Sequence, residues 1–334
     1  MTAFAPGRVN LIGDHTDYAG GLALPMAIDL GTTVVGAPTD EPVVRLTSDD
    51  QPEPAVVPID VGDPSTVAPS WARYVAGVVA EVAPTHGFRG AVHSTVPIGS
   101  GLSSSAALEL AVALAVGFEG DPLALARLGQ RAEQRASGVP CGLMDQLTSA
   151  CGIAGHGLLI DFATDTWTPV PIPADAEVVV VHSGEARALA GSAYAERRAA
   201  VEAAATRIGP LGSATLDRLD EIDDPVVRRR ARHVITEDQR VRAFAEALRA
   251  GDLTLAGHEM VASHESLRED FEVSTPRLDA LVAELCAMPG VVGARLTGAG
   301  FGGCLVALAE PGAVAPTGRA WVVHAADGAR RIRS

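Results

Sequence analysis

The sequence predicts an α+β fold. Short β-branched runs and longer amphipathic runs both occur along the 334 residues, but they do not alternate regularly as they do in βαβ proteins. Hydrophobic residues make up 47% of the chain and charged residues 20%, which is the balance of a globular protein. The length suits two domains of ordinary size. A proline-rich stretch, Thr168–Asp175, marks the expected boundary, with one domain over 1–173 and the other over 174–334.

Local patterns predict the individual elements. Strands are expected where β-branched or alternating residues are bounded by turn residues, over Thr32–Ala37, Val43–Ser48, Phe88–Val96, Leu158–Phe162 and Glu177–Ser183. The first two are expected to form a hairpin-like pair, and the segment Gln51–Pro69, rich in Pro and Asp, is expected to be a loop. Helical spacing predicts helices over Ser70–Val82, from about Ser103, and over Pro122–Ser137, Ser192–Arg207, Asp224–Ala250 and Pro276–Ala287.

Charge excludes several classes of function. The formal net charge of −15 argues against nucleic acid or an anionic membrane as the main partner, because both require a cationic surface. All 26 basic residues are arginine. P-loop NTPases and protein kinases place a lysine on the phosphates, and Schiff-base enzymes use a lysine nucleophile. A lysine-free chain therefore belongs to none of these three classes.

The cysteines and the N-terminus indicate the compartment. The four cysteines show no C-x-x-C spacing, so they are expected to be free thiols in a reducing cytosol. The N-terminus lacks a basic region followed by an apolar one, and no stretch approaches an uncharged membrane span. We expect a soluble, cytoplasmic protein.

The opening stretch GRVNLIGDHTDY crowds polar groups into consecutive positions. Asp14, His15, Thr16 and Asp17 directly follow a short apolar run, with Arg8 upstream. A surface turn needs fewer polar groups than this. The density predicts a site that hydrogen-bonds a polyhydroxylated ligand from several directions.

Two glycine-rich segments are candidates for close approach of the backbone to a ligand. In Pro97–Ala106, PIGSGLSSSA, glycines and serines precede a helix that is apolar nearly all round, which suits a phosphate at a helix N-terminus; an ordinary N-cap is the structural alternative. In Thr297–Cys304, TGAGFGGC, the glycines exceed what a hairpin needs, although a bulged hairpin also fits. The surrounding segment Ala294–Leu308 is predicted to be strand, turn and strand.

Two carboxylates further along are candidates for chemistry. Asp145 stands alone among apolar and small residues in PCGLMDQL, so it should be buried and need a partner or a catalytic role. Arg8 is a candidate partner that would keep Asp145 ionised and could stabilise charge on a transferring phosphoryl group. Glu133 lies in an amphipathic helix, where the structural interpretation is a solvated residue of the helix face.

Several spaced segments together resemble the GHMP family of small-molecule kinases and, within it, the galactokinases. GRVNLIGDHTDYAGGLALP resembles the galactokinase signature, PIGSGLSSSAALELA the second GHMP motif and LTGAGFGGCLVAL the third. CGLMDQ and GSAYAERRAA are similar to the segments that hold the base and a sugar-contacting tyrosine. RHVITEDQRVRAF and HESLREDFEVSTPRLD resemble galactokinase helices. The resemblance runs from Pro6 to about Leu308.

This resemblance implies a fold, a reaction and partners. The GHMP kinase fold has two α+β domains, an N-terminal ribosomal-protein-S5-like one and a C-terminal ferredoxin-like one, with the active site in the cleft between them. The implied reaction converts ATP and a sugar, galactose by this resemblance, into the sugar 1-phosphate and ADP. We expect a monomer that uses Mg²⁺ with ATP and that binds no nucleic acid or membrane.

The resemblance also implies a role for each matching residue. Asp145 would take the proton from the anomeric hydroxyl, Arg8 would orient Asp145 and stabilise the transition state, and Ser105 and Glu133 would hold Mg²⁺. The sugar hydroxyls would be bound by Asp14, His15, Thr16, Asp17, Gly142 and Tyr194, of which Tyr194 also fits plain packing at a helix start. The nucleotide would be bound by Gly99, Ser100, Gly101, Leu102, Ser103, Ser104 and Ser105, with Trp71 and Ser48 close by.

Two departures from the family pattern bear on the substrate. Asp14 stands where galactokinases usually carry Glu, which draws the carboxylate back by roughly 1.5 Å from the position that meets the C6 end of the sugar. Such a site could also suit arabinose, and N-acetylgalactosamine is a further alternative. Only five residues precede Pro6, fewer than relatives usually carry, so the packing around the sugar site can differ from theirs. A non-catalytic sensor of sugar and ATP ranks lower, because the serine loop and Asp145 are intact.

Overall fold

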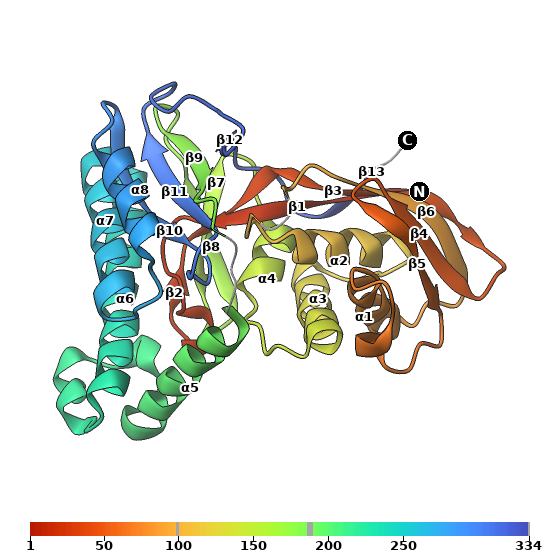
Figure 1. Cartoon of the computed structure of the whole chain (residues 1–334), viewed down its shortest axis with the longest axis horizontal. Coiled ribbons are helices and arrows are strands. Elements are labelled where there is room, and N and C mark those ends of the chain that lie inside the picture. The colour runs from red at the N-terminus through yellow and green to blue at the C-terminus, as the bar shows by residue number, and fades with distance from the viewer. Residues whose placement is uncertain (98–99, 186–189, 333–334) are drawn as a thin grey trace.

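The computed structural model describes residues 1–97, 100–185 and 190–332, with side chains described from 193 onward in the last range. It has the predicted α+β architecture, in two halves (Figure 1). The strands are β1 (Thr2–Asn10), β2 (Leu22–Ala23), β3 (Pro25–Thr39), β4 (Val43–Ser48), β5 (Gln51–Pro58), β6 (Gly87–Ser94), β7 (His156–Asp161), β8 (Thr166–Pro171), β9 (Glu177–His182), β10 (Val291–Thr297), β11 (Cys304–Ala309), β12 (Ala320–Val323) and β13 (Arg330–Ile332). The helices are α1 (Ala72–Val82), α2 (Ser104–Ala115), α3 (Pro122–Ser137), α4 (Met144–Cys151), α5 (Ala190–Ile208), α6 (Pro225–Ala250), α7 (Leu253–Glu269) and α8 (Pro276–Cys286).

The first half is a six-stranded sheet covered by helices. The strand order is β13-β1-β3-β6-β4-β5, and every neighbouring pair is antiparallel except the parallel pair β4 and β6. Helices α1, α2 and α3 lie along one face of this sheet (Figure 1). Helix α2 is apolar nearly all round, as the sequence predicts, and it packs against β1, β3, α1 and α3. Because α2 is enclosed in this way, residues 100–103 directly before it lie in the interior of the first half.

The expected pairing of Thr32–Ala37 with Val43–Ser48 is wrong. Strand β3 pairs with β1 on one side and with β6 on the other, and β6 then separates β3 from β4. A short connection predicts that consecutive strands are neighbours, but here a strand from later in the chain lies between them.

The expected loop over Gln51–Pro69 is also partly wrong, because residues Gln51–Pro58 form β5. This strand is at the edge of the sheet and pairs only with β4. Proline lacks an N–H group and is tolerated on an edge strand, where one side of the backbone has no partner. The Pro-rich composition that indicated a loop therefore suits an edge strand equally well.

The second half is a four-stranded sheet of order β10-β11-β9-β12 with α6, α7 and α8 beside it (Figure 1). The β10 and β11 strands are joined by the glycine-rich turn, as predicted. Cap signals explain why the bounds of α6 were predictable: Asp224 accepts hydrogen bonds from two backbone N–H groups, Pro225 follows it, and Gly251 ends the helix in the left-handed conformation. Helix α7 overlaps the segment HESLREDFEVSTPRLD, which was expected to be helical by resemblance but without bounds of its own.

The two halves are joined by shared structure around the end of β1. One hydrophobic cluster combines Val9, Leu11 and Ile12 with Phe244 of α6 and Val306 of β11. Strand β13, which follows the second half in the sequence, pairs with β1. A separate small sheet is formed by β2, β7 and β8. The boundary at residues 173 and 174 lies between β8 and β9 and stays a prediction. No helix among the described residues combines the length and apolar character needed to cross a membrane.

Candidate active site

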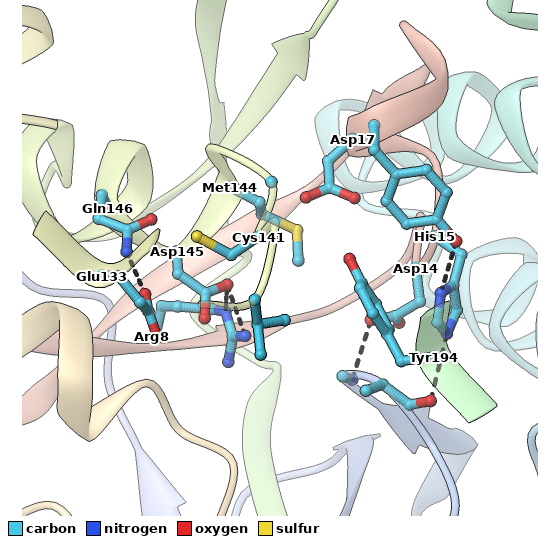
Figure 2. Close-up of a pocket in the computed structure, with 15 residues that line it drawn as sticks. Arg8, Asp14, His15, Asp17, Glu133, Cys141, Met144, Asp145, Gln146 and Tyr194 are labelled. Carbon is cyan, nitrogen blue, oxygen red and sulfur yellow. Dashed lines mark hydrogen bonds and ion pairs between the residues drawn. The ribbon is translucent and has the colours of Figure 1, made fainter. Parts of the chain in front are cut away.

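A cavity of about 300 Å³ lies where the end of β1, the start of α4, α5 and the β10–β11 turn approach one another (Figure 2). We call it the main cavity. It is lined by Arg8, Asp14, His15, Asp17, Tyr18, Glu133, Val139, Cys141, Gly142, Met144, Asp145, Gln146, Tyr194, Gly298 and Ala299. Segments from both halves of the sequence therefore form one site.

Arg8 and Asp145 form an ion pair at one end of the main cavity. The Nε and Nη2 atoms of Arg8 lie 2.8 and 2.6 Å from Oδ1 of Asp145, and Nη1 donates to the carbonyl of Gly101 at 2.7 Å. The other carboxylate oxygen of Asp145 accepts a hydrogen bond of 2.6 Å from the hydroxyl of Ser103. The side chain of Arg8 is 7% exposed and that of Asp145 is 30% exposed, toward the cavity. The predicted pairing of these two residues is confirmed.

Ser103 does not act as the ordinary N-cap that was the structural alternative for the serine loop. Its side chain makes no hydrogen bond to the first turn of α2, and its backbone has a left-handed φ of 59°. Its hydroxyl contacts Asp145 instead. The first N–H groups of α2 therefore have no side-chain cap from Ser103, which leaves them available to an anion.

Glu133 lies beside Asp145 and is not a solvated residue of the helix face. Its Oε1 accepts a hydrogen bond from Ser105 at 3.0 Å, and its Oε2 accepts one from the amide of Gln146. The same amide lies 3.3 Å from the fully buried Glu109 of α2. Burial, and next the charge of Asp145, raise the pKa of Glu133. A cation at this position would offset both effects.

Asp14 and His15 occupy the end of the main cavity opposite Arg8 and Asp145 (Figure 2). The Oδ1 atom of Asp14 accepts a hydrogen bond of 2.9 Å from the N–H of Gly298, and Oδ2 lies 2.6 Å from Nη2 of Arg295. His15 adopts a left-handed φ of 65°, and its ring nitrogens lie 2.9 Å from the Tyr18 hydroxyl and 3.3 Å from the carbonyl of Ala299. Burial lowers the pKa of His15 to about 3, so the ring is neutral.

Asp17, Gly142 and Tyr194 complete the wall between these ends. A Cβ atom on Gly142 would lie 1.6 Å from Oδ2 of Asp17, so only glycine fits beside this carboxylate. Burial, and next the charge of Asp145, raise the pKa of Asp17 to about 7. The Tyr194 ring lies 5.7 Å from that of Tyr18 in an edge-on arrangement. This wall presents a carboxylate and aromatic faces, the groups that commonly hold a sugar ring.

Thr16 does not line the main cavity. Its hydroxyl lies 2.9 Å from the carbonyl of Gly13 and 2.7 Å from that of Leu22, and the residue is fully buried. The structure therefore corrects the expectation that Thr16 contacts the sugar: its side chain holds the turn that carries Asp14 and His15.

A second cavity of about 270 Å³ brings the expected nucleotide residues together. It is lined by Ser48, Trp71, Ser104 and Ser105, among others, and Trp71 is held by a 3.0 Å hydrogen bond from its ring N–H to the carbonyl of Glu53. We call it the side cavity. The contact between Ser105, which lines the side cavity, and Glu133, which lines the main cavity, links the two.

The remaining residues of the serine loop lie away from both cavities or are not described. Ser100 is buried and donates to the carbonyl of Pro97, and the apolar Leu102 is buried; neither lines a cavity. Gly101 supplies the carbonyl that Arg8 contacts. Gly99 lies outside the described residues.

The glycine-rich turn was predicted as a candidate for close approach to a ligand, and its residues Gly298 and Ala299 line the main cavity. Other residues of the site were not predicted. Tyr18, Val139, Cys141, Met144 and Gln146 also line it without having been singled out. Arg295 is fully buried behind Asp14, and a charged residue within an otherwise apolar strand was the available signal.

Family models match three parts of the chain. Residues 1–38 match the galactokinase galactose-binding signature, residues 72–153 the N-terminal domain of GHMP kinases and residues 244–322 the C-terminal domain of GHMP kinases. A human galactokinase is 44% identical over 333 residues, which cover 94% of this chain and 84% of the human one. The chain belongs to the galactokinase family.

Other members of the galactokinase family agree with this assignment. A galactokinase of Mycobacterium bovis is 46% identical over 320 residues, covering 91% of this chain and 87% of its own. The crystal structure of Lactococcus lactis galactokinase complexed with galactose superimposes with a TM-score of 0.92 at 32% identity, covering 99% of this chain and 95% of that one. A mevalonate kinase of Methanococcus jannaschii shares the GHMP kinase fold, with a TM-score of 0.70 at 23% identity over 93% of this chain and 90% of its own.

Proposed function

We propose that the chain catalyses the ATP-dependent phosphorylation of galactose at its anomeric hydroxyl, giving galactose 1-phosphate and ADP. One observation carries the proposal: the main and side cavities meet at the contact between Ser105 and Glu133, next to the Arg8–Asp145 pair. A sugar in the main cavity and a nucleotide in the side cavity would bring the acceptor hydroxyl and the terminal phosphate to this point. Membership of the galactokinase family supports the same reaction.

Asp145 acts as the base in this proposal. Its carboxylate is fixed by Arg8 on one oxygen and by Ser103 on the other, and it faces the cavity. It accepts the proton of the anomeric hydroxyl as that oxygen attacks the terminal phosphorus of ATP. Phosphoryl transfer asks for little covalent work by the protein, so positioning and charge stabilisation dominate. Arg8 remains charged throughout and stabilises the phosphoryl group in the transition state.

Ser105 and Glu133 would hold Mg²⁺. The hydroxyl and the carboxylate oxygen lie 3.0 Å apart, and oxygen donors of these two kinds are what Mg²⁺ prefers. A bound ion would supply charge neutralisation for phosphoryl transfer. Gln146 fixes the second oxygen of Glu133 and so orients the carboxylate.

Asp14, His15, Asp17, Gly142 and Tyr194 hold the sugar. All five line the main cavity, where the carboxylate oxygens of Asp14 and Asp17 accept hydrogen bonds from sugar hydroxyls and the neutral ring of His15 contacts the sugar. The backbone of Gly142 approaches the sugar closely because it has no side chain. We further infer a monomeric, cytoplasmic enzyme whose partners are the sugar and ATP rather than nucleic acid or a membrane, in keeping with the acidic net charge.

One observation favours a second candidate, a kinase for arabinose or another related sugar. Both oxygens of Asp14 are engaged by Arg295 and Gly298, and the side chain is one methylene group shorter than that of Glu, so it reaches less far toward the C6 end of a sugar. A sugar that lacks C6 needs no contact there.

A sugar panel tests the proposal. Purified protein with Mg²⁺ and ATP should release ADP with galactose, and relative kcat/KM should rank galactose above arabinose, N-acetylgalactosamine and glucose. A higher value for arabinose would favour the second candidate. Absence of ADP release with every sugar would overturn the kinase proposal, and calorimetric binding of ATP and galactose without turnover would then indicate a sensor.

A further inference from the structure

We infer that Arg295 is a positioning residue that orients Asp14. This orientation makes the site prefer a sugar that carries a hydroxyl at the end of the ring away from the anomeric carbon over one that lacks it. The inference rests on the proposed function, which puts the anomeric hydroxyl beside Asp145. Figure 2 shows Asp14 and His15 at the opposite end of the cavity. The far hydroxyls of a sugar bound in this direction, those at C4 and C6, lie toward Asp14.

Arg295 is completely buried, yet it does not line the cavity itself. It projects from β10 to the segment that follows β1, where Nη1 donates to the carbonyl of Leu11 at 3.1 Å and Nη2 lies 2.6 Å from Asp14. Arg295 forms an ion pair with one oxygen of Asp14, and the N–H of Gly298 holds the other, so the carboxylate is restrained on both sides at the wall of the main cavity.

A buried cluster of charges lies behind this pair. Glu237 of α6 lies 3.9 Å from Arg295 and accepts hydrogen bonds from the N–H of Gly13 and from Arg240. The charges alternate, with Asp14 and Glu237 offset by Arg295 and Arg240. Burial raises the pKa of Asp14, and the charge of Arg295 is the largest influence that opposes this rise. Loss of Arg295 would therefore leave Asp14 without its contact on Oδ2 and more inclined to bind a proton.

The same strand and turn hold His15. The carbonyl of Ala299, four positions after Arg295 in the sequence, lies 3.3 Å from Nε2 of His15. Both polar residues at this end are thus oriented from the second half of the chain. A site built to hydrogen-bond a hydroxyl rejects an analogue that lacks it, because buried polar groups are then left unpaired. The orientation that Arg295 imposes is what makes Asp14 such a group.

The test measures binding rather than turnover. Titration calorimetry gives Kd for galactose, 4-deoxygalactose, 6-deoxygalactose and ATP with the wild type and with Arg295→Met, which keeps the length of the side chain without its charge. The wild type should bind at least one deoxy analogue about tenfold or more weakly than galactose. In Arg295→Met, the Kd for galactose should be roughly 10- to 100-fold higher than in the wild type. The Kd for the deoxy analogue that the wild type binds more weakly should rise less than about threefold, and the Kd for ATP should stay within about twofold.

Three further variants separate positioning from a loss of folding. Arg295→Lys keeps the charge, so its discrimination between galactose and the deoxy analogue should lie between those of the wild type and Arg295→Met. If Arg295→Met does not fold, Arg295→Lys provides the test instead. Arg230→Met removes the other fully buried arginine, whose partners do not line the cavity, and should leave the discrimination unchanged. In an Asp14→Asn background, the change at Arg295 should alter galactose binding by less than about twofold, because no carboxylate remains to be oriented.

Several outcomes would overturn the inference. One is that Arg295→Met and Arg295→Lys weaken the binding of galactose and of both deoxy analogues equally; another is that Arg230→Met loses the discrimination to the same extent. The inference also fails if the change at Arg295 weakens galactose binding as much in the Asp14→Asn background as in the wild type. It fails as well if the wild type binds galactose and the two deoxy analogues equally. Failure of the proposed function looks different, since it is absence of ADP release in the sugar panel, whatever the binding ratios are.

Discussion

The two ends of the main cavity are built in different ways. The transfer end, formed by Arg8, Ser103, Ser105, Glu133 and Asp145, lies on elements of the first half of the chain, which pack against one another in one core. The sugar end brings together the segment after β1, Tyr194 of α5 and the β10–β11 turn. Its central contact joins Asp14 to Gly298, which are 284 positions apart.

This difference separates the chemistry from the choice of substrate. The side chains for phosphoryl transfer are held by contacts with other residues of the same half. The groups that bind the sugar are oriented by residues of the second half. Substitutions there can change the preferred sugar without changing the transfer step.

The largest effect is expected at the transfer end. Asp145→Asn keeps an acceptor for Ser103 but removes the base and the charge that pairs with Arg8, so kcat should fall about 1000-fold while the Kd for galactose changes little. Steady-state kinetics and calorimetry measure the two. Asp165→Asn is the matched control, because Asp165 is 32% exposed and also pairs with an arginine, Arg127. An Asp145→Asn variant that keeps more than a tenth of its kcat would rule out this role.

A smaller effect is expected at the wall between the ends. The methyl group of Gly142→Ala would collide with Asp17, and the carboxylate would have to move out of its place. Overpacking of this size costs about 1–3 kcal/mol, so the KM for galactose should rise roughly 10- to 100-fold with the KM for ATP unchanged. Gly62→Ala, at a position with open space around it, should have no effect. Equal rises in both KM values would show that the change spreads to the transfer end.

The pH dependence of sugar binding should come from Asp17. Because the pKa of Asp17 is raised to about 7, the residue carries a proton below this pH and loses an acceptor for a sugar hydroxyl. The KM for galactose should therefore rise about threefold to tenfold as the pH falls from 8 to 6. His15 does not contribute, since its pKa is about 3. Asp17→Asn should give a KM that is higher and independent of pH; a persisting inflection near 7 would assign the titration to another group.

The smallest effect is expected from a change of side-chain length at the sugar end. Asp14→Glu extends the carboxylate toward the cavity by one methylene group, so the ratio of kcat/KM for galactose over arabinose should increase about twofold to fivefold. Asp63→Glu, at an exposed site far from the cavity, should leave the ratio unchanged. If Asp14→Glu leaves it unchanged too, Asp14 does not contact the C6 end of the sugar.

The bounds of elements that carry their own boundary signals could be predicted from the sequence. The pairing of strands could not be predicted where the partner strand is distant in the sequence. Helix α3 was predicted with its bounds because Asp121, Pro122 and Gly138 mark its ends. The neighbours of β3 and β4 were not, because β6, which lies between them, comes from beyond α1. Pairing between distant strands leaves no local pattern in either of them.

The same distinction applies to the site. A lone carboxylate in an apolar run needs a partner, so the pairing of Asp145 with Arg8 could be predicted. Arg295 could not be connected to Asp14, because each could have paired with any opposite charge in the chain. Glu133 looks like a residue of a solvated helix face from its spacing, and only the packing of Gln146 and Ser105 against it shows otherwise. The division into domains at residues 173 and 174 stays a prediction.

The pairing of β13 with β1 has a consequence for synthesis on the ribosome. Strand β1 carries Arg8, and among the described residues its outer edge pairs with 330–332, which are translated after every residue of the site. A nascent chain arrested before β13 would therefore contain the complete set of catalytic groups but expose an open sheet edge, which can pair with a second nascent chain on the same message. Completion of the sheet thus follows the translation of every residue of the site.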